Sequence, residues 1–109
     1  MAYDEGSAQI LQEALGDIDG VTTKKMFGGL CFMLNGNMLC GVHKDGGMFR
    51  IGKANETAAL AVDGASPLGF TGRKMGGMVE VTDDAIADES ALSELMKLAL
   101  DFVGSLPTK

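Results

Sequence analysis

Few side chains in this sequence could do chemistry: two cysteines, one histidine and eight methionines among 109 residues. Cys31 and Cys40 stand on either side of an Asn-Gly pair, each within a short apolar run, and this pattern predicts a β-hairpin. A two-residue turn at Asn35-Gly36 would place Cys31 directly opposite Cys40, with the two Cα atoms about 4.5 Å apart. A disulfide at that distance is strained. The two thiols could therefore act as an easily reduced redox pair, or they could simply fill the sheet surface as small apolar residues.

No further residue type completes a catalytic or metal site. His43 is the only histidine, and no nucleophile motif accompanies it. Two thiols and one distant imidazole fall short of the four ligands of a zinc site. The methionines would suit Cu(I), but no C-x-x-C pair supports such a site. We therefore predict that the protein is not an enzyme and holds no metal or cofactor.

The apolar pattern predicts one α+β domain over residues 1–109. Strands are expected within residues 21–51 and at 78–82, and residues 65–76 are expected to form a loop. Helices are predicted at three places: residues 4–17, the residues after an N-cap at Asn55, and the residues after an N-cap at Asp88. The expected architecture has two layers, an antiparallel sheet of about five strands with helices on one face.

Two registers compete for the second hairpin, which turns at Lys44-Asp45-Gly46. One pairs Val42 with Phe49; the other pairs Gly41 with Phe49 and sends Arg50 to the opposite face. We favour the second register because it keeps the large apolar side chains on one face and the charged one off it. The residues gathered on that face are Leu30, Phe32, Leu34, Leu39, Phe49 and Ile51.

The other face of the predicted sheet is also apolar, although no helix is expected to cover it. Exposed apolar patches of this kind usually mark protein contacts, and a symmetric dimer is the simplest contact. We therefore predict a homodimer through this face. Its predicted residues are Cys31, Met33, Met38, Cys40, Val42, Met48 and Arg50.

The charge distribution limits the classes of partner. The net charge is −6, with +4 in residues 24–74 and −10 in the rest of the chain. A net acidic domain lacks the field that drives non-specific nucleic-acid binding, so the basic middle segment supports at most a weak nucleic-acid site. The sequence has no apolar run long enough to span a bilayer and no basic signal region at its start, so we expect a cytoplasmic protein without membrane contact.

One stretch of the chain resembles the TfoX/Sxy N-terminal domain family. A Met-Phe-Gly-Gly corner precedes an apolar strand and an Asn-Gly hairpin, and a Gly-Arg-Lys-Met step follows later; the resemblance extends over roughly residues 8–103. The motif residues are Met26, Phe27, Gly28, Gly29, Asn35, Gly36, Gly72 and Arg73.

The resemblance implies a fold similar to that of type III secretion chaperones and a stand-alone N-terminal domain. The best-known family members regulate bacterial competence together with the cyclic-AMP receptor protein. The expected function is therefore a non-enzymatic regulatory or adaptor module that binds a protein partner not identified by the sequence. The alternatives are a thiol redox sensor using Cys31 and Cys40, and a weak nucleic-acid-binding domain.

Overall fold

The computed structural model describes residues 3–26, 29–43, 46–70 and 73–108. Over these residues the chain forms one antiparallel sheet with strand order β1-β2-β3-β4-β6-β5. The strands are β1 (Val21–Met26), β2 (Gly29–Leu34), β3 (Asn37–His43), β4 (Gly46–Arg50), β5 (Ala65–Phe70) and β6 (Arg73–Val81). The helices are α1 (Glu5–Leu15), the 3-10 turn η1 (Lys53–Asn55), α2 (Glu56–Leu60), α3 (Asp83–Ala87) and α4 (Glu89–Val103).

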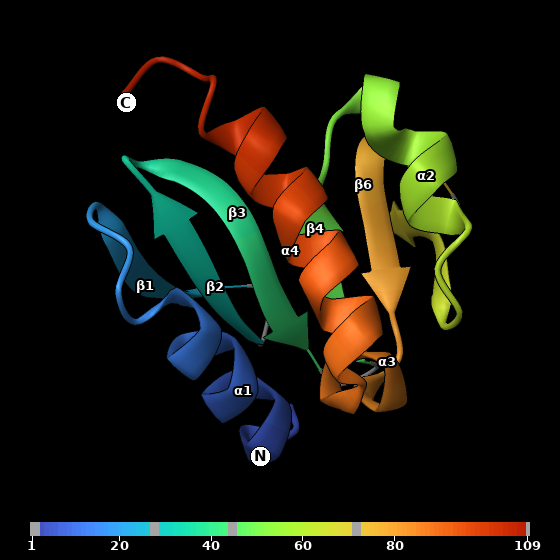
Figure 1. The fold of residues 1–109 in the computed structure, drawn as a ribbon, viewed down its shortest axis with the longest axis horizontal. Coiled ribbons are helices and arrows are strands. Elements are labelled where there is room, and N and C mark those ends of the chain that lie inside the picture. Colours follow the sequence, from blue (N-terminus) through green and yellow to red (C-terminus); the bar gives the residue numbers. More distant parts are fainter. Residues whose placement is uncertain (1–2, 27–28, 44–45, 71–72, 109) are drawn as a thin grey trace.

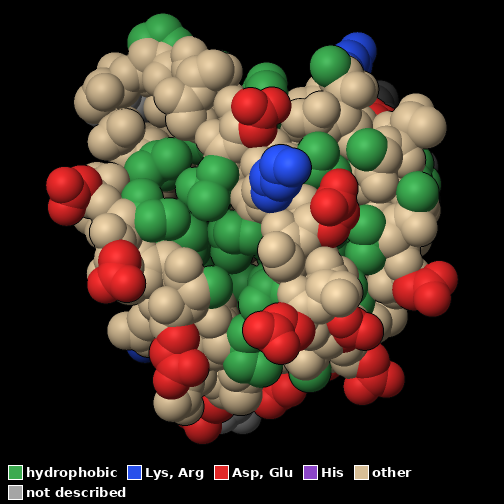
Figure 2. Space-filling model, viewed as in Figure 1, with side chains coloured by type: hydrophobic (Ala, Val, Ile, Leu, Met, Phe, Trp, Pro, Cys, Tyr) green, Lys and Arg blue, Asp and Glu red, His purple; other side chains and the backbone are tan. Residues whose placement is uncertain are grey.

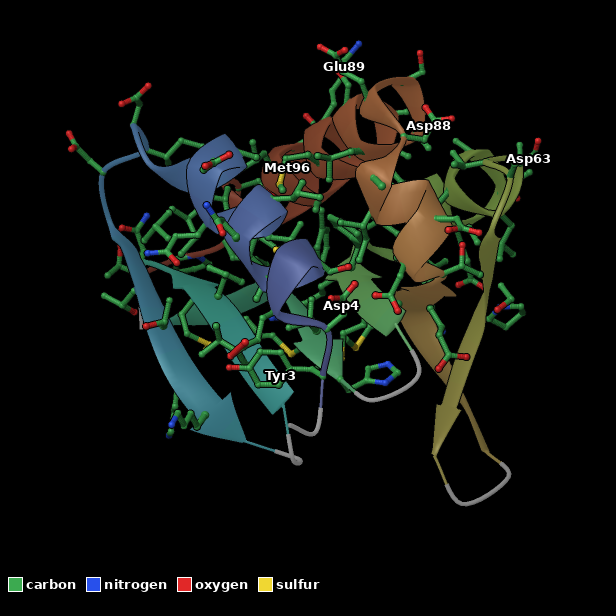
Figure 3. All side chains as sticks on the ribbon, turned by 90° about the horizontal axis from the view of Figure 1, so that it is seen from below. Tyr3, Asp4, Asp63, Asp88, Glu89 and Met96 are labelled. Carbon is green, nitrogen blue, oxygen red and sulfur yellow. The ribbon has the colours of Figure 1, made fainter. Side chains whose placement is uncertain are left out.

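The helices form a single layer on one face of the sheet, which confirms the predicted two-layer α+β fold (Figure 1). The long helix α4 crosses β3 and β4, α1 lies beside it over β3, and α2 covers β5 and β6. Figure 3, seen from below, shows the opposite face of the sheet without a helix. We call this opposite face the outer face.

Side chains cap the start of two long helices, and one of these caps, Asp88, was predicted. The Asp4 carboxylate accepts a hydrogen bond from the Gly6 amide at the start of α1, and Asp88 accepts from Ser90 and Ala91 at the start of α4. The predicted N-cap at Asn55 was wrong in its chemistry, because η1 runs directly into α2 and the Asn55 side chain makes no capping bond.

The first hairpin has the predicted turn but not the predicted register throughout. Asn35 and Gly36 both have positive φ, at 52° and 84°, as a type I′ turn requires. Met33 pairs with Met38 as expected, but a bulge then inserts Leu39, so that Phe32 pairs with Cys40 and Cys31 with Gly41. The prediction that Cys31 lies directly opposite Cys40 was therefore wrong.

Both registers considered for the second hairpin were wrong as well, because Cys40 pairs with Phe49 and Gly41 with Met48. The segregation of side chains that favoured the second register is nevertheless present, since Leu39, Phe49 and Ile51 all lie in the core. The bulge explains both facts. One extra residue on β3 turns Cys40 and Val42 toward the core, and the pairing with β4 shifts by one so that Cys40 lies opposite Phe49 on the core face.

Residues 65–76 were predicted as a loop, but the described part of this segment belongs to β5 and to the start of β6, which raises the sheet to six strands. The edge position of β5 explains why its pattern is weak. Pro67 cannot donate a ladder hydrogen bond and is tolerated at an edge, and a further register shift follows it. The short helix α3 was not predicted. Its N-cap is Thr82, whose hydroxyl accepts from the Ala85 amide.

Candidate functional site

Four of the seven residues predicted on the outer face lie there together. Cys31, Met33, Met38 and Met48 form one cluster with Met78, a residue that the sequence analysis did not single out. Every member of this cluster carries sulfur. The cluster is more closed than expected: Cys31 is 0%, Met48 1% and Met78 9% exposed within a single chain.

Side chains of the sheet itself close the centre of the outer face. Gly41 is the register partner of both Cys31 and Met48, and the Met48 methyl carbon lies 3.2 Å from the position that a Gly41 Cβ would take. Met48 therefore fills the space that glycine leaves beside Cys31. Figure 3 also shows β1 and the β5–β6 hairpin reaching beyond the central strands on this side. Only Met33 and Met38 remain half-buried at the border of the cluster.

The remaining predicted residues of the outer face are placed differently. Cys40 and Val42 were expected there, but both are 0% exposed in the main core beneath the helices, because the bulge turns this part of β3 over. Arg50 is half-buried, and its guanidinium carbon lies 5.6 Å from the centroid of the Phe102 ring on α4. This distance is typical of a cation–π contact, so the charge contacts the helix layer.

The two thiols lack the properties of a redox pair. They belong to separate clusters, one on the outer face and one in the core. Burial raises the pKa of the Cys31 thiol, and burial together with the charge of a Cys31 thiolate raises the pKa of Cys40. Because the thiolate is the reactive form, both cysteines are poor nucleophiles at neutral pH.

We expect the raised pKa of Cys40 to make the protein less stable in alkali. Below the ordinary thiol pKa of 9.0 both folded and unfolded chains keep the proton. Above it the unfolded chain loses the proton while the folded chain keeps it, so the free energy of unfolding falls by about 1.4 kcal/mol per pH unit. Urea titrations between pH 8 and pH 10 measure this slope. In the Cys40→Ala variant we expect the free energy of unfolding to fall less steeply with pH. An identical slope in both proteins would contradict the raised pKa of Cys40.

His43 lies at the end of β3, on the border of the outer face. Its Nε2 is 3.5 Å from Oε1 of Glu80 on β6, so a protonated imidazole would form an ion pair there. Over the described residues, no three His, Cys, Asp or Glu side chains gather in the manner of a metal site.

The family-motif residues have structural roles where they are described. Gly29 is required because a Cβ at this position would lie 2.0 Å from the Val42 carbonyl oxygen. Asn35 and Gly36 form the hairpin turn. Met26 and Arg73 belong to β1 and β6 by their backbones. Phe27, Gly28 and Gly72 lie outside the described residues.

Three lysines of the middle segment have side chains that the structure describes, and they lie in two separate places. Lys24 and Lys25 are exposed on the edge strand β1, whereas Lys53 is exposed in η1, which packs against β6. Three strands separate β1 from β6 in the sheet. Lys24 and Lys25 therefore do not form one patch with Lys53 that could follow a nucleic-acid backbone.

A hollow that the sequence analysis missed lies on the helix side, between α1 and α4, and we call it the α1–α4 groove. Its volume is about 690 Å³. Figure 2 shows a continuous hydrophobic patch in this part of the helix layer, with acidic side chains around it. Met96, labelled in Figure 3, lies between the two helices. The groove is lined by Ala14, Glu89, Leu92, Ser93, Met96, Lys97, Leu100 and Asp101.

One hydrogen bond and the path of the chain connect the two walls of the groove. The Ser7 hydroxyl of α1 lies 2.7 Å from the Asp83 carboxylate of α3, and α3 leads through the Asp88 cap directly into α4. On the core side, Leu11 and Leu95 are both 0% exposed. α1 is therefore linked to the segment that leads into α4, and side chains above the core line the groove.

The width of the apolar surface on α4 is the signal that could have predicted the groove. On a helical wheel the apolar residues of α4 occupy one continuous arc of about 200°, with Leu98 at one edge and Leu100 at the other. A helix that packs on a single sheet needs an apolar arc of little more than ~100°. Leu95, Ala99 and Val103 face the core, while Leu92 and Leu100 remain half-buried on the groove side.

Fold and sites together define a small two-layer α+β domain with an open sheet and an apolar groove on its helix face. Comparison with known families gives a more specific assignment: the model of the TfoX N-terminal domain family matches residues 13–103. The chain belongs to the TfoX N-terminal domain family, as its Met-Phe-Gly-Gly corner suggested. Neither the curated proteins nor the solved structures contain a match. Within the described residues, no helix has the length and apolar character needed to cross a membrane.

Proposed function

We propose that this domain is a non-enzymatic regulatory module that works by binding another protein, in keeping with the competence-regulator type of its family. The observation that carries the proposal is the α1–α4 groove, because an apolar hollow on an otherwise charged surface is typical of a protein-binding site. Leu92, Met96 and Leu100 lie one helical turn apart along α4 and offer a row of apolar contacts to a partner.

The chemistry of the described residues supports a binding role over catalysis. The two thiols are buried and protonated at neutral pH, and the single histidine lies beside a carboxylate on the other side of the sheet from the groove. Among the residues that line the groove, Ser93 carries the one hydroxyl, and neither a histidine nor a cysteine accompanies it.

The Leu100→Gln variant tests the groove. Partners retained by the wild-type chain from the native cytoplasm are purified, and their affinity for both proteins is measured. We expect Leu100→Gln to weaken binding by about tenfold or more, because a leucine that becomes buried in a complex contributes strongly to affinity. Circular dichroism verifies the fold. Ala58→Gln introduces the same side chain on the exposed face of α2 and is the matched control. Equal affinity for all three proteins would exclude the groove as the binding site.

The homodimer through the outer face stays a separate prediction. In the structure, the apolar residues that a second copy could contact there are Met33 and Met38, since the rest of the cluster is buried within one chain. We expect sedimentation to give the mass of a dimer, and Met38→Lys to give a monomer with little loss of stability. A monomeric wild-type chain at high concentration would contradict this prediction and leave the groove proposal untouched.

A further inference from the structure

The charges around the α1–α4 groove are strongly biased toward acid. α1 contains Glu5 and Glu13 but no lysine or arginine, and the segment that follows it adds Asp17 and Asp19. α4 contains three carboxylates and one basic residue, Lys97. In the groove lining itself, Glu89 and Asp101 stand at the two ends of the α4 wall and Lys97 stands between them.

This charge bias excludes several possible occupants of the groove. Nucleic acids and anionic membrane surfaces are repelled by carboxylates. A second copy of this chain is also disfavoured, because it would bring its own acidic helix layer against the first and the net charge of each chain is −6. A cationic protein segment is the occupant that gains from the same field.

The shape of the groove indicates the conformation of the segment. From Glu89 to Asp101 the α4 wall is about 18 Å long, which corresponds to three turns of a helix lying alongside it. Leu92, Met96 and Leu100 follow each other at intervals of four residues. A partner helix with apolar side chains at positions i, i+3, i+4 and i+7 would interdigitate with such a row.

We propose that the α1–α4 groove binds a cationic amphipathic helix of a partner protein. Its apolar stripe packs on Leu92, Met96 and Leu100, and its lysines or arginines face Glu89 and Asp101. This inference rests on the proposed protein-binding function and adds the chemistry of the partner.

Three synthetic peptides test the proposal with the full chain. The first is a Leu/Lys peptide of about five turns with a helical apolar stripe, long enough to extend past both ends of the groove. The second keeps the stripe but replaces every Lys by Glu. The third has the composition of the first in a scrambled order without a stripe. Fluorescence anisotropy measures each affinity at low salt and at physiological salt. We expect the first peptide to bind at least about tenfold more tightly than the other two, and more weakly as salt rises.

Charge variants with opposite expected signs make the test specific to the groove. The Glu89→Gln/Asp101→Asn variant neutralises both end carboxylates, and we expect it to lower the affinity for the first peptide by about three- to tenfold. The Lys97→Gln variant should instead raise the affinity for the first peptide, because it removes the one positive charge from the groove lining. Asp63 lies on the far side of the helix layer from Met96 (Figure 3). The Asp63→Asn variant is therefore the control, and we expect it to leave the affinity for the first peptide unchanged.

The outcomes separate this inference from the proposed function. If the Glu peptide binds as tightly as the Lys peptide and Leu100→Gln weakens both, the groove is a docking site and the cationic preference is overturned. If the scrambled peptide binds as tightly as the first peptide, charge alone accounts for the attraction, and the proposal that the groove binds an amphipathic helix is overturned. If no peptide binds at millimolar concentration the inference fails, and the proposed function fails with it only if Leu100→Gln also leaves every purified partner bound.

Discussion

Replacing Phe32 by alanine is expected to cost about 3–5 kcal/mol of the free energy of unfolding. Phe32 is 1% exposed and lies on β2, in the core between sheet and helices. Its removal leaves a cavity bounded by strands whose pairing limits how far they can move, so little of the lost contact is regained. Urea denaturation followed by circular dichroism measures the loss.

The neighbouring residue on the same strand gives the control for Phe32→Ala. Met33 points to the outer face and is half-buried, so Met33→Ala should cost clearly less than Phe32→Ala. The pair therefore distinguishes the two faces of β2 without changing the strand. A Phe32→Ala loss below about 1 kcal/mol, or a larger loss at Met33, would mean that the core lies on the other side of the sheet.

Gly29→Ala is expected to destabilise the domain by about 3 kcal/mol, at the upper end of the range for overpacking. A Cβ at Gly29 would lie 2.0 Å from the Val42 carbonyl oxygen and 3.0 Å from its carbon. Both atoms belong to the backbone of β3, so no side-chain rotation relieves the clash and the β2–β3 pairing must open. Thermal unfolding reports the change as a lower Tm.

Gly6→Ala is the matched substitution with the opposite expected sign. A Cβ at Gly6 in α1 would meet nothing closer than 3.4 Å, and alanine favours the helix over glycine by roughly 0.5–1 kcal/mol. A Gly29→Ala protein as stable as the wild type would rule out the close approach of β2 to Val42 and, with it, our explanation of the second glycine in the Met-Phe-Gly-Gly corner.

The homodimer prediction depended on an outer face with a bare apolar centre, and the structure changes that premise. Apolar side chains do gather there, but Met48 and Met78 pack over Cys31 until the centre of the face is closed. The accessible hollow lies on the opposite side, between helices. Sequence periodicity indicates which face of a strand is apolar, but not whether neighbouring side chains already cover that face.

Local chemistry explains what the sequence by itself determined about this protein. The Asn35-Gly36 turn and the cap at Asp88 depend on residues within a few positions of each other, and both are confirmed. The family suggested by the Met-Phe-Gly-Gly corner is confirmed as well. The energies of the turn and the cap come from backbone conformation and from short-range hydrogen bonds, which a sequence pattern records directly.

Only the tertiary structure decided the rest, because those features depend on contacts between distant segments. The bulge at Leu39 places Cys40 in the core and separates it from Cys31, and it is stable because the packing of β3 under α4 outweighs the ideal hairpin register. The edge strand β5 forms because β6 offers it a partner. The wide apolar surface of α4 can be read from the sequence, but the α1–α4 groove exists only because the fold brings α1 alongside that surface. It is there that we expect the partner to bind.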